Sequence, residues 1–75
     1  MQIFIRNEIK ARARLSKGLL RILEDDVNML NIDVDDLNLL SIEESIKETK
    51  DTLHDIMDNL NELENAVISL KEVRK

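Results

Sequence analysis

Four basic side chains in the first third of the chain have a spacing that suits phosphate binding. They recur at steps of four and three residues, so on a helix they share one side. We call them the basic stripe: Lys10, Arg14, Lys17 and Arg21. A positive patch concentrates phosphate locally even on a chain whose net charge is −5. Nucleic-acid binding is therefore one candidate function.

The only histidine, His54, follows Asp51 by three residues. A carboxylate and a histidine at this spacing bind iron in some helical bundles, but those ligands project into the core. In this sequence the neighbouring Leu53 has the core position. A catalytic base would also need a cleft and a nucleophile within helical reach. His54 is accordingly predicted to be a solvated surface residue, neither a metal ligand nor a base.

A third set resembles a calcium-binding loop only in part. Asp33, Asp35 and Glu44 match positions one, three and twelve of an EF-hand loop. Leu37 and Asn38 then stand where that loop needs an oxygen donor and a glycine. The sequence has no cysteine and no glycine-rich phosphate loop. We therefore expect no enzyme activity, no cofactor and no bound metal.

Composition favours helices. The chain has 75 residues, with no proline, one glycine and one aromatic residue, and 43% hydrophobic and 36% charged residues. That balance is typical of long helices and coiled coils. A single all-α domain, 1–75, is expected. The lack of cysteine suits a reducing compartment such as the cytoplasm, and no apolar run reaches the ~20 residues that span a bilayer, so we expect no membrane contact.

The second half carries a heptad repeat, abcdefg, in which positions a and d are apolar. Position a holds Leu39, Ile46, Leu53, Leu60 and Val67, and position d holds Ile42, Thr49, Ile56, Leu63 and Leu70. Ser41 and Glu44 form a capping-box pattern, which predicts a helix over about 41–74. Leu39 keeps the same phase, so an earlier start capped by Asp33 or Asp35 is the alternative.

The first half predicts a helix over about 7–31, joined to the second by a turn at about 32–40. Its heptads place Ala13, Leu20 and Val27 at a, and Ile9, Ser16, Leu23 and Leu30 at d. Residues 1–6 are either its first turn or an extended lead-in before Asn7 as cap. A second apolar row, the helix 1 stripe, lies beside the heptad positions: Leu15, Leu19, Ile22 and Met29. One partner helix cannot cover so wide a face.

Two amphipathic helices and a short connection predict an antiparallel hairpin. Covering the helix 1 stripe most simply takes a second hairpin, giving a dimeric four-helix bundle or a coiled-coil-like assembly. The g column of the second helix favours a bundle over a parallel zipper, because its residues are small or apolar rather than charged. It reads Ser45, Thr52, Asn59, Ala66, Val73. Thr49 and Ser16 are candidates to fix the register by hydrogen bonds inside the contact.

The charge distribution suggests pairing between helices. Residues 1–23 hold six basic side chains and one acidic, whereas 24–75 hold five basic and fifteen acidic. A turn near Asp36 would bring each residue of the basic stripe level with an acidic one. The expected pairs are Lys10 with Glu62, Arg14 with Asp58, Lys17 with Asp55 and Arg21 with Asp51. The basic stripe would then fix helix register, within the chain or across a dimer.

These patterns predict a small non-enzymatic protein-interaction module, such as a regulator, inhibitor or assembly factor, that acts by helix–helix packing. A homodimer and a further protein partner are expected. The helix 1 stripe, Leu15, Leu19, Ile22 and Met29, is the candidate partner-binding site. The alternative is a nucleic-acid-binding hairpin that uses the basic stripe.

Overall fold

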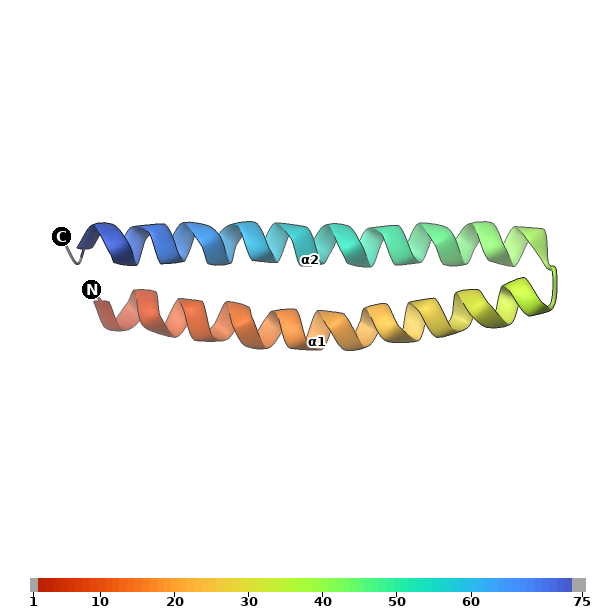
Figure 1. Ribbon diagram of the computed structural model, residues 1–75, viewed down its shortest axis with the longest axis horizontal. Helices are drawn as coiled ribbons and strands as arrows, with labels where there is room; N and C mark the ends of the chain where they lie inside the picture. The colour runs from red at the N-terminus through yellow and green to blue at the C-terminus, as the bar shows by residue number, and fades with distance from the viewer. Residues whose placement is uncertain (1, 74–75) are drawn as a thin grey trace.

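The computed structural model describes residues 2–73, and it confirms an all-helical hairpin (Figure 1). Helix α1 spans Gln2–Asp35 and helix α2 spans Leu39–Val73. The two helices run antiparallel and side by side along their whole length, so the start of α1 and the end of α2 lie at the same end of the rod. The Cα atoms extend over 56 × 14 × 12 Å, so the hairpin is a rod.

Both helices are longer than the sequence patterns predicted. Residues 2–6 belong to α1, so the helical alternative for this segment holds and Asn7 is not a cap. At its other end α1 continues through 32–35, which were assigned to the turn. No proline interrupts either half, so nothing stops the helices before the reversal. The predicted end of the second helix, residue 74, lies outside the described residues.

The chain reverses over residues 36–38, inside the predicted turn. Leu37 has a φ of 52°, the left-handed conformation. Its N–H donates to the carbonyl of Val34 at 3.1 Å, and the N–H of Asn38 donates to that of Asp33 at 3.4 Å. These two bonds form the Schellman motif that commonly ends a helix, with leucine in the position usually held by glycine.

Asn38 then starts α2. Its side-chain Oδ1 accepts a hydrogen bond from the N–H of Ser41 at 3.3 Å, and its carbonyl accepts from the N–H of Ile42 at 2.9 Å. Asn38 is therefore the N-cap, and Ser41 lies three residues inside the helix. The capping box predicted at Ser41 is wrong, as are the alternative caps Asp33 and Asp35. The earlier start in phase with Leu39 is correct.

The hairpin has almost no apolar interior. Ala66 is the only buried hydrophobic residue among those described, and no large side chain is fully enclosed. The accessible surface is 6096 Å². A compact monomer of 8.7 kDa would expose about 4,700 Å², so the hairpin exposes roughly 1,400 Å² more. Most of its apolar side chains face outward.

The left-handed Leu37 leads to a stability prediction. Leu37→Gly should raise the free energy of unfolding by about 0.5–1 kcal/mol, because glycine removes the left-handed strain and the leucine side chain is largely exposed. Leu40→Gly is the matched control, an exposed leucine in the first turn of α2, and should lower that free energy by about 1 kcal/mol. Urea unfolding at one fixed protein concentration measures both. Equal effects of the two substitutions would contradict a strained turn.

Candidate interaction surfaces

The line of contact between α1 and α2, the seam, uses heptad positions d and g. In α1 its residues are Ile5, Ile9, Arg12, Ser16, Leu19, Leu23, Asp26, Leu30 and Asp33. In α2 they are Ile42, Ser45, Thr49, Thr52, Ile56, Asn59, Leu63, Ala66 and Leu70. All of these seam residues are buried or half-buried. The residues at position a are exposed, and this includes Arg6 and Ala13 as well as the large apolar residues. The sequence analysis predicted that positions a and d would form the contact between the helices. This prediction is right for position d and wrong for position a.

Position g forms the seam because its side chains in α2 are small and can hydrogen-bond across it. Ser45 Oγ donates to Asp33 Oδ2, and Thr52 Oγ1 donates to Asp26 Oδ2 at 2.6 Å. Both pairs join position g of α1 to position g of α2. The two pairs are seven residues apart along each helix. Leucines at a would have filled the seam with bulk and left these polar groups of α2 without these partners. Each such bond contributes about 0.5–1.5 kcal/mol to stability.

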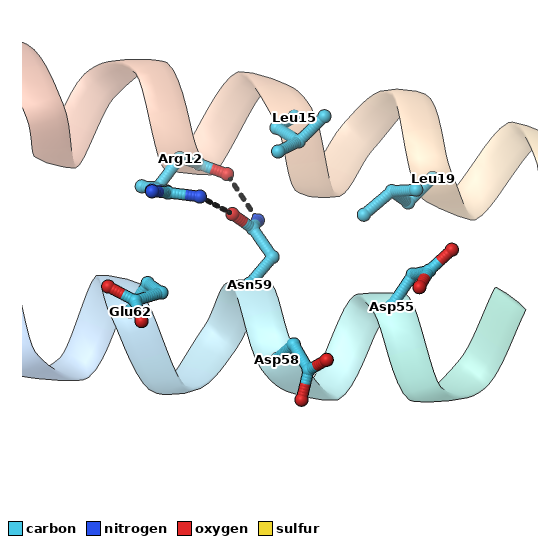
Figure 2. A pocket seen from close by; sticks show the side chains of 7 residues that line it. All are labelled: Arg12, Leu15, Leu19, Asp55, Asp58, Asn59 and Glu62. Carbon is cyan, nitrogen blue, oxygen red and sulfur yellow. Dashed lines mark hydrogen bonds between the residues drawn. The ribbon is translucent and has the colours of Figure 1, made fainter. Parts of the chain in front are cut away.

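Asn59 makes the third polar crossing (Figure 2). Its Nδ2 donates to the carbonyl of Arg12 at 2.8 Å and to Ser16 Oγ at 2.7 Å. Its Oδ1 accepts from the Arg12 guanidinium at 3.3 Å. Ser16 thus bonds across the seam as predicted, but Thr49 does not, because its hydroxyl donates to the carbonyl of Ser45 in its own helix at 2.7 Å. Register depends on Asn59 rather than on Thr49.

One side of the hairpin is an open apolar surface, which we call the broad face. At 100° per residue, position a lies about 90° from the seam, and because the helices are antiparallel both a columns fall on the same side. The large apolar members are Leu20, Val27 and Val34 in α1, and Leu39, Ile46, Leu53, Leu60 and Val67 in α2. They are between 39% and 75% exposed. The position a residues, which were predicted to form the core of the helix pair together with position d, are therefore uncovered.

The helix 1 stripe lies on the opposite side, where it borders a hollow that we call the groove. Leu15, Ile22 and Met29 are 47%, 51% and 54% exposed, and Leu19 is half-buried beside the seam. Across from Leu15 and Leu19, α2 contributes Asp55, Asp58, Asn59 and Glu62 (Figure 2). This open hollow has a volume of about 280 Å³. The structure thus joins part of the predicted partner site to an acidic wall.

The basic stripe points away from α2. Lys10, Arg14, Lys17 and Arg21 are all exposed, at positions e and b, roughly 130° and 170° around α1 from the seam. Among the side chains of residues 3–72, no lysine or arginine lies within ion-pair distance of a carboxylate. The predicted pairs with Glu62, Asp58, Asp55 and Asp51 within the chain are therefore wrong. They assumed a seam through a and d, which would have turned the stripe toward α2.

His54 is exposed, as predicted, and its Nδ1 lies 3.3 Å from Asp58 Oδ2 one turn along α2. Within the described residues, no three histidine or acidic side chains converge as a metal site would require.

No family model, curated protein or solved structure matched this chain in the three comparisons made. Within residues 2–73, neither helix contains a stretch long and apolar enough to cross a bilayer.

The sequence reasoning missed two features of these surfaces. It did not identify Ser45, Thr52 and Asn59 as the polar core of the seam, and it did not identify the a columns as an open face. The signal was present, because a column of small polar residues at a period of seven permits two helices to approach closely. Its acidic partners Asp26 and Asp33 repeat with the same period in α1. Reading both columns together would have found the seam.

Asn59→Ala should lower the free energy of unfolding by about 1–3 kcal/mol, because it removes three hydrogen bonds across the seam and leaves partly buried groups unpaired. Asn65→Ala is the control. Asn65 is exposed on the same helix, so alanine there should be neutral or stabilise by a few tenths of a kcal/mol through helix propensity. Urea unfolding at matched protein concentration tests both. Similar values for the two variants would show that the polar crossing adds no stability.

Proposed function

We propose that this chain is a small non-enzymatic protein-interaction module, a regulator, inhibitor or assembly factor, that acts by packing its helices against other helices. One observation carries this proposal: the seam residues that are fully buried are small or polar, whereas eighteen large hydrophobic residues among those described are exposed. Monomeric proteins rarely leave contiguous apolar patches this extensive open to water. Self-association as a dimer is part of the proposal, and the lack of cysteine supports a reducing, cytoplasmic setting.

The groove is the proposed site for a different protein. On its α1 side, Leu15 and Leu19 line it beside Arg12, whose guanidinium donates to Asn59. Ile22 and Met29 continue the helix 1 stripe along α1, at the spacing that an amphipathic helix uses. Its α2 side offers the carboxylates of Asp55, Asp58 and Glu62. The complementary partner is an amphipathic helix with an apolar face and a row of lysine or arginine along one flank. Charge complementarity of this kind favours the correct orientation and partner more than it adds affinity.

A synthetic amphipathic peptide tests the groove. We expect a helix of about 21 residues, with leucine on one face and lysine along one flank, to bind the full chain in fluorescence anisotropy. Ile22→Glu should weaken this binding at least about tenfold, because the introduced carboxylate must be desolvated against the peptide. Asn28→Glu adds the same charge on the back of α1 and should have little effect.

Replacing the lysines of the peptide with glutamates should also weaken binding, because α2 presents acidic side chains at the groove. Equal binding of both peptides, or equal loss in Ile22→Glu and Asn28→Glu, would contradict the groove as the site.

Nucleic-acid binding is the second candidate, and one observation favours it: the basic stripe is exposed and makes no ion pair within the chain. The acidic net charge and the single aromatic residue oppose it. If the stripe binds nucleic acid, mixed-sequence RNA or DNA should bind at low salt with an affinity that falls steeply as salt increases. Arg14→Glu with Arg21→Glu should then abolish binding. A wild-type chain that binds neither polymer at low salt removes this candidate.

A further inference from the structure

We propose that the broad face is covered by a second copy of this chain, related by a two-fold axis perpendicular to the helices, so that the two turns lie at opposite ends of a four-helix bundle. In this arrangement α1 packs on α1 of the second copy and α2 on α2, each pair antiparallel. The inference rests on the proposed function, which includes self-association as a dimer, and adds which face is covered and how the two copies are oriented. It concerns a different surface from the groove.

The edge of the broad face on α2 is self-complementary in charge. Position e lies about 40° beyond position a, so its side chains border the face. Along α2 this column reads Glu43, Lys50, Met57, Glu64, Lys71, and all five are exposed. An antiparallel copy centred on Met57 reverses the order. Glu43 then meets Lys71 of the second copy, Lys50 meets Glu64 of the second copy, and the two Met57 side chains meet at the axis.

The corresponding edge on α1 places the axis at the same height. Its column holds Lys10, Lys17 and Glu24, so an antiparallel copy centred on Lys17 pairs Lys10 with Glu24 of the second copy. Ser16, the residue before Lys17, accepts a hydrogen bond from Asn59, two residues after Met57. The centres of the two columns therefore lie level with each other, and a single perpendicular axis passes through both. Lys17 faces its own copy there, the one like-charge contact on this edge.

The other two-fold arrangement satisfies fewer charges. With the axis parallel to the helices, α1 would pack on α2 of the second copy and both turns would lie at one end. Lys10 would meet Glu64 and Glu24 would meet Lys50, whereas Glu43 would face an asparagine and Lys71 an isoleucine. The perpendicular axis pairs these two charges as well. Two more ion pairs in each dimer outweigh the contact between the two Lys17 side chains.

The surface area is sufficient for such a dimer. A standard interface covers about 800 Å² of each partner, and the hairpin exposes roughly 1,400 Å² more than a compact monomer of its mass. The broad face presents eight large apolar side chains along the length of the rod, at the heptad position that faces the core of four-helix bundles.

Solution mass tests the face. We expect the full chain to be a dimer by light scattering at micromolar concentration, and Leu53→Asp to raise the dimer dissociation constant at least about a hundredfold. Ile22→Glu lies on the groove side and should leave the dimer intact while it weakens peptide binding. The groove as a binding site and the broad face as the dimer interface can therefore fail separately. A wild-type monomer at high concentration, or a Leu53→Asp variant that dimerises as tightly as wild type, overturns the inference.

A single cysteine tests the axis. Met57→Cys should form a disulfide-linked dimer on mild oxidation, because the two copies of residue 57 meet at the axis, and the sequence has no other cysteine. His54→Cys, on the outer side of α2, should cross-link far more slowly. Lys50→Glu alone should weaken the dimer, and Lys50→Glu with Glu64→Lys should restore it. If Met57→Cys fails to cross-link, and if Lys50→Glu with Glu64→Lys weakens the dimer further, the two-fold axis is parallel to the helices. That result overturns the inference.

Discussion

Polar contacts at every seventh residue decide which sides of the two helices meet. Asp33 with Ser45, Asp26 with Thr52 and the cluster around Asn59 bond across the seam, and each involves a small or short side chain of α2 at heptad position g. A partly buried carboxylate or amide is costly unless it is hydrogen-bonded. Rotation or sliding of one helix would break these hydrogen bonds and leave the polar groups without a partner. The pairs therefore set register and orientation together, and the leucines and isoleucines at a are turned outward as a consequence.

A body of two helices can bury only one line of each, and here that line is narrow and partly polar. Burial of apolar area usually supplies most of the free energy of folding. The hairpin by itself buries little of that area, because Ala66 is the only buried hydrophobic residue among those described. The remaining apolar columns lie on two sides of the rod, the broad face and the groove. The broad face runs along the length of both helices, which is the geometry of helix packing rather than of a pocket for a small molecule. Stability and function are thus linked through association.

Charge acts at the borders of these faces. The seam contains no lysine or arginine paired with a carboxylate among the side chains of residues 3–72, and the basic stripe lies on the outer side of α1. Exposed ion pairs contribute only about 0–1 kcal/mol each and weaken with salt, so the charged columns do not hold the hairpin together. Their order along the chain matters more, because it determines which neighbouring helix, in which direction, meets opposite charges.

The sequence by itself determined the helices and their phase. The absence of proline, the single glycine and the heptads of residues 39–70 specify two long amphipathic helices, because helix periodicity is a local property of the chain. The place of the reversal, within residues 32–40, also followed from local turn chemistry. Which columns face each other did not follow, since a, d and g all fall within one side of the helix and the choice depends on contacts between residues of different helices, such as Thr52 and Asp26. That choice moved Leu53 and its neighbours from the expected core to an open face and separated the basic stripe from its expected partners within the chain. Only the tertiary structure decided these points, because each is a competition between surfaces that are adjacent in space and distant in sequence.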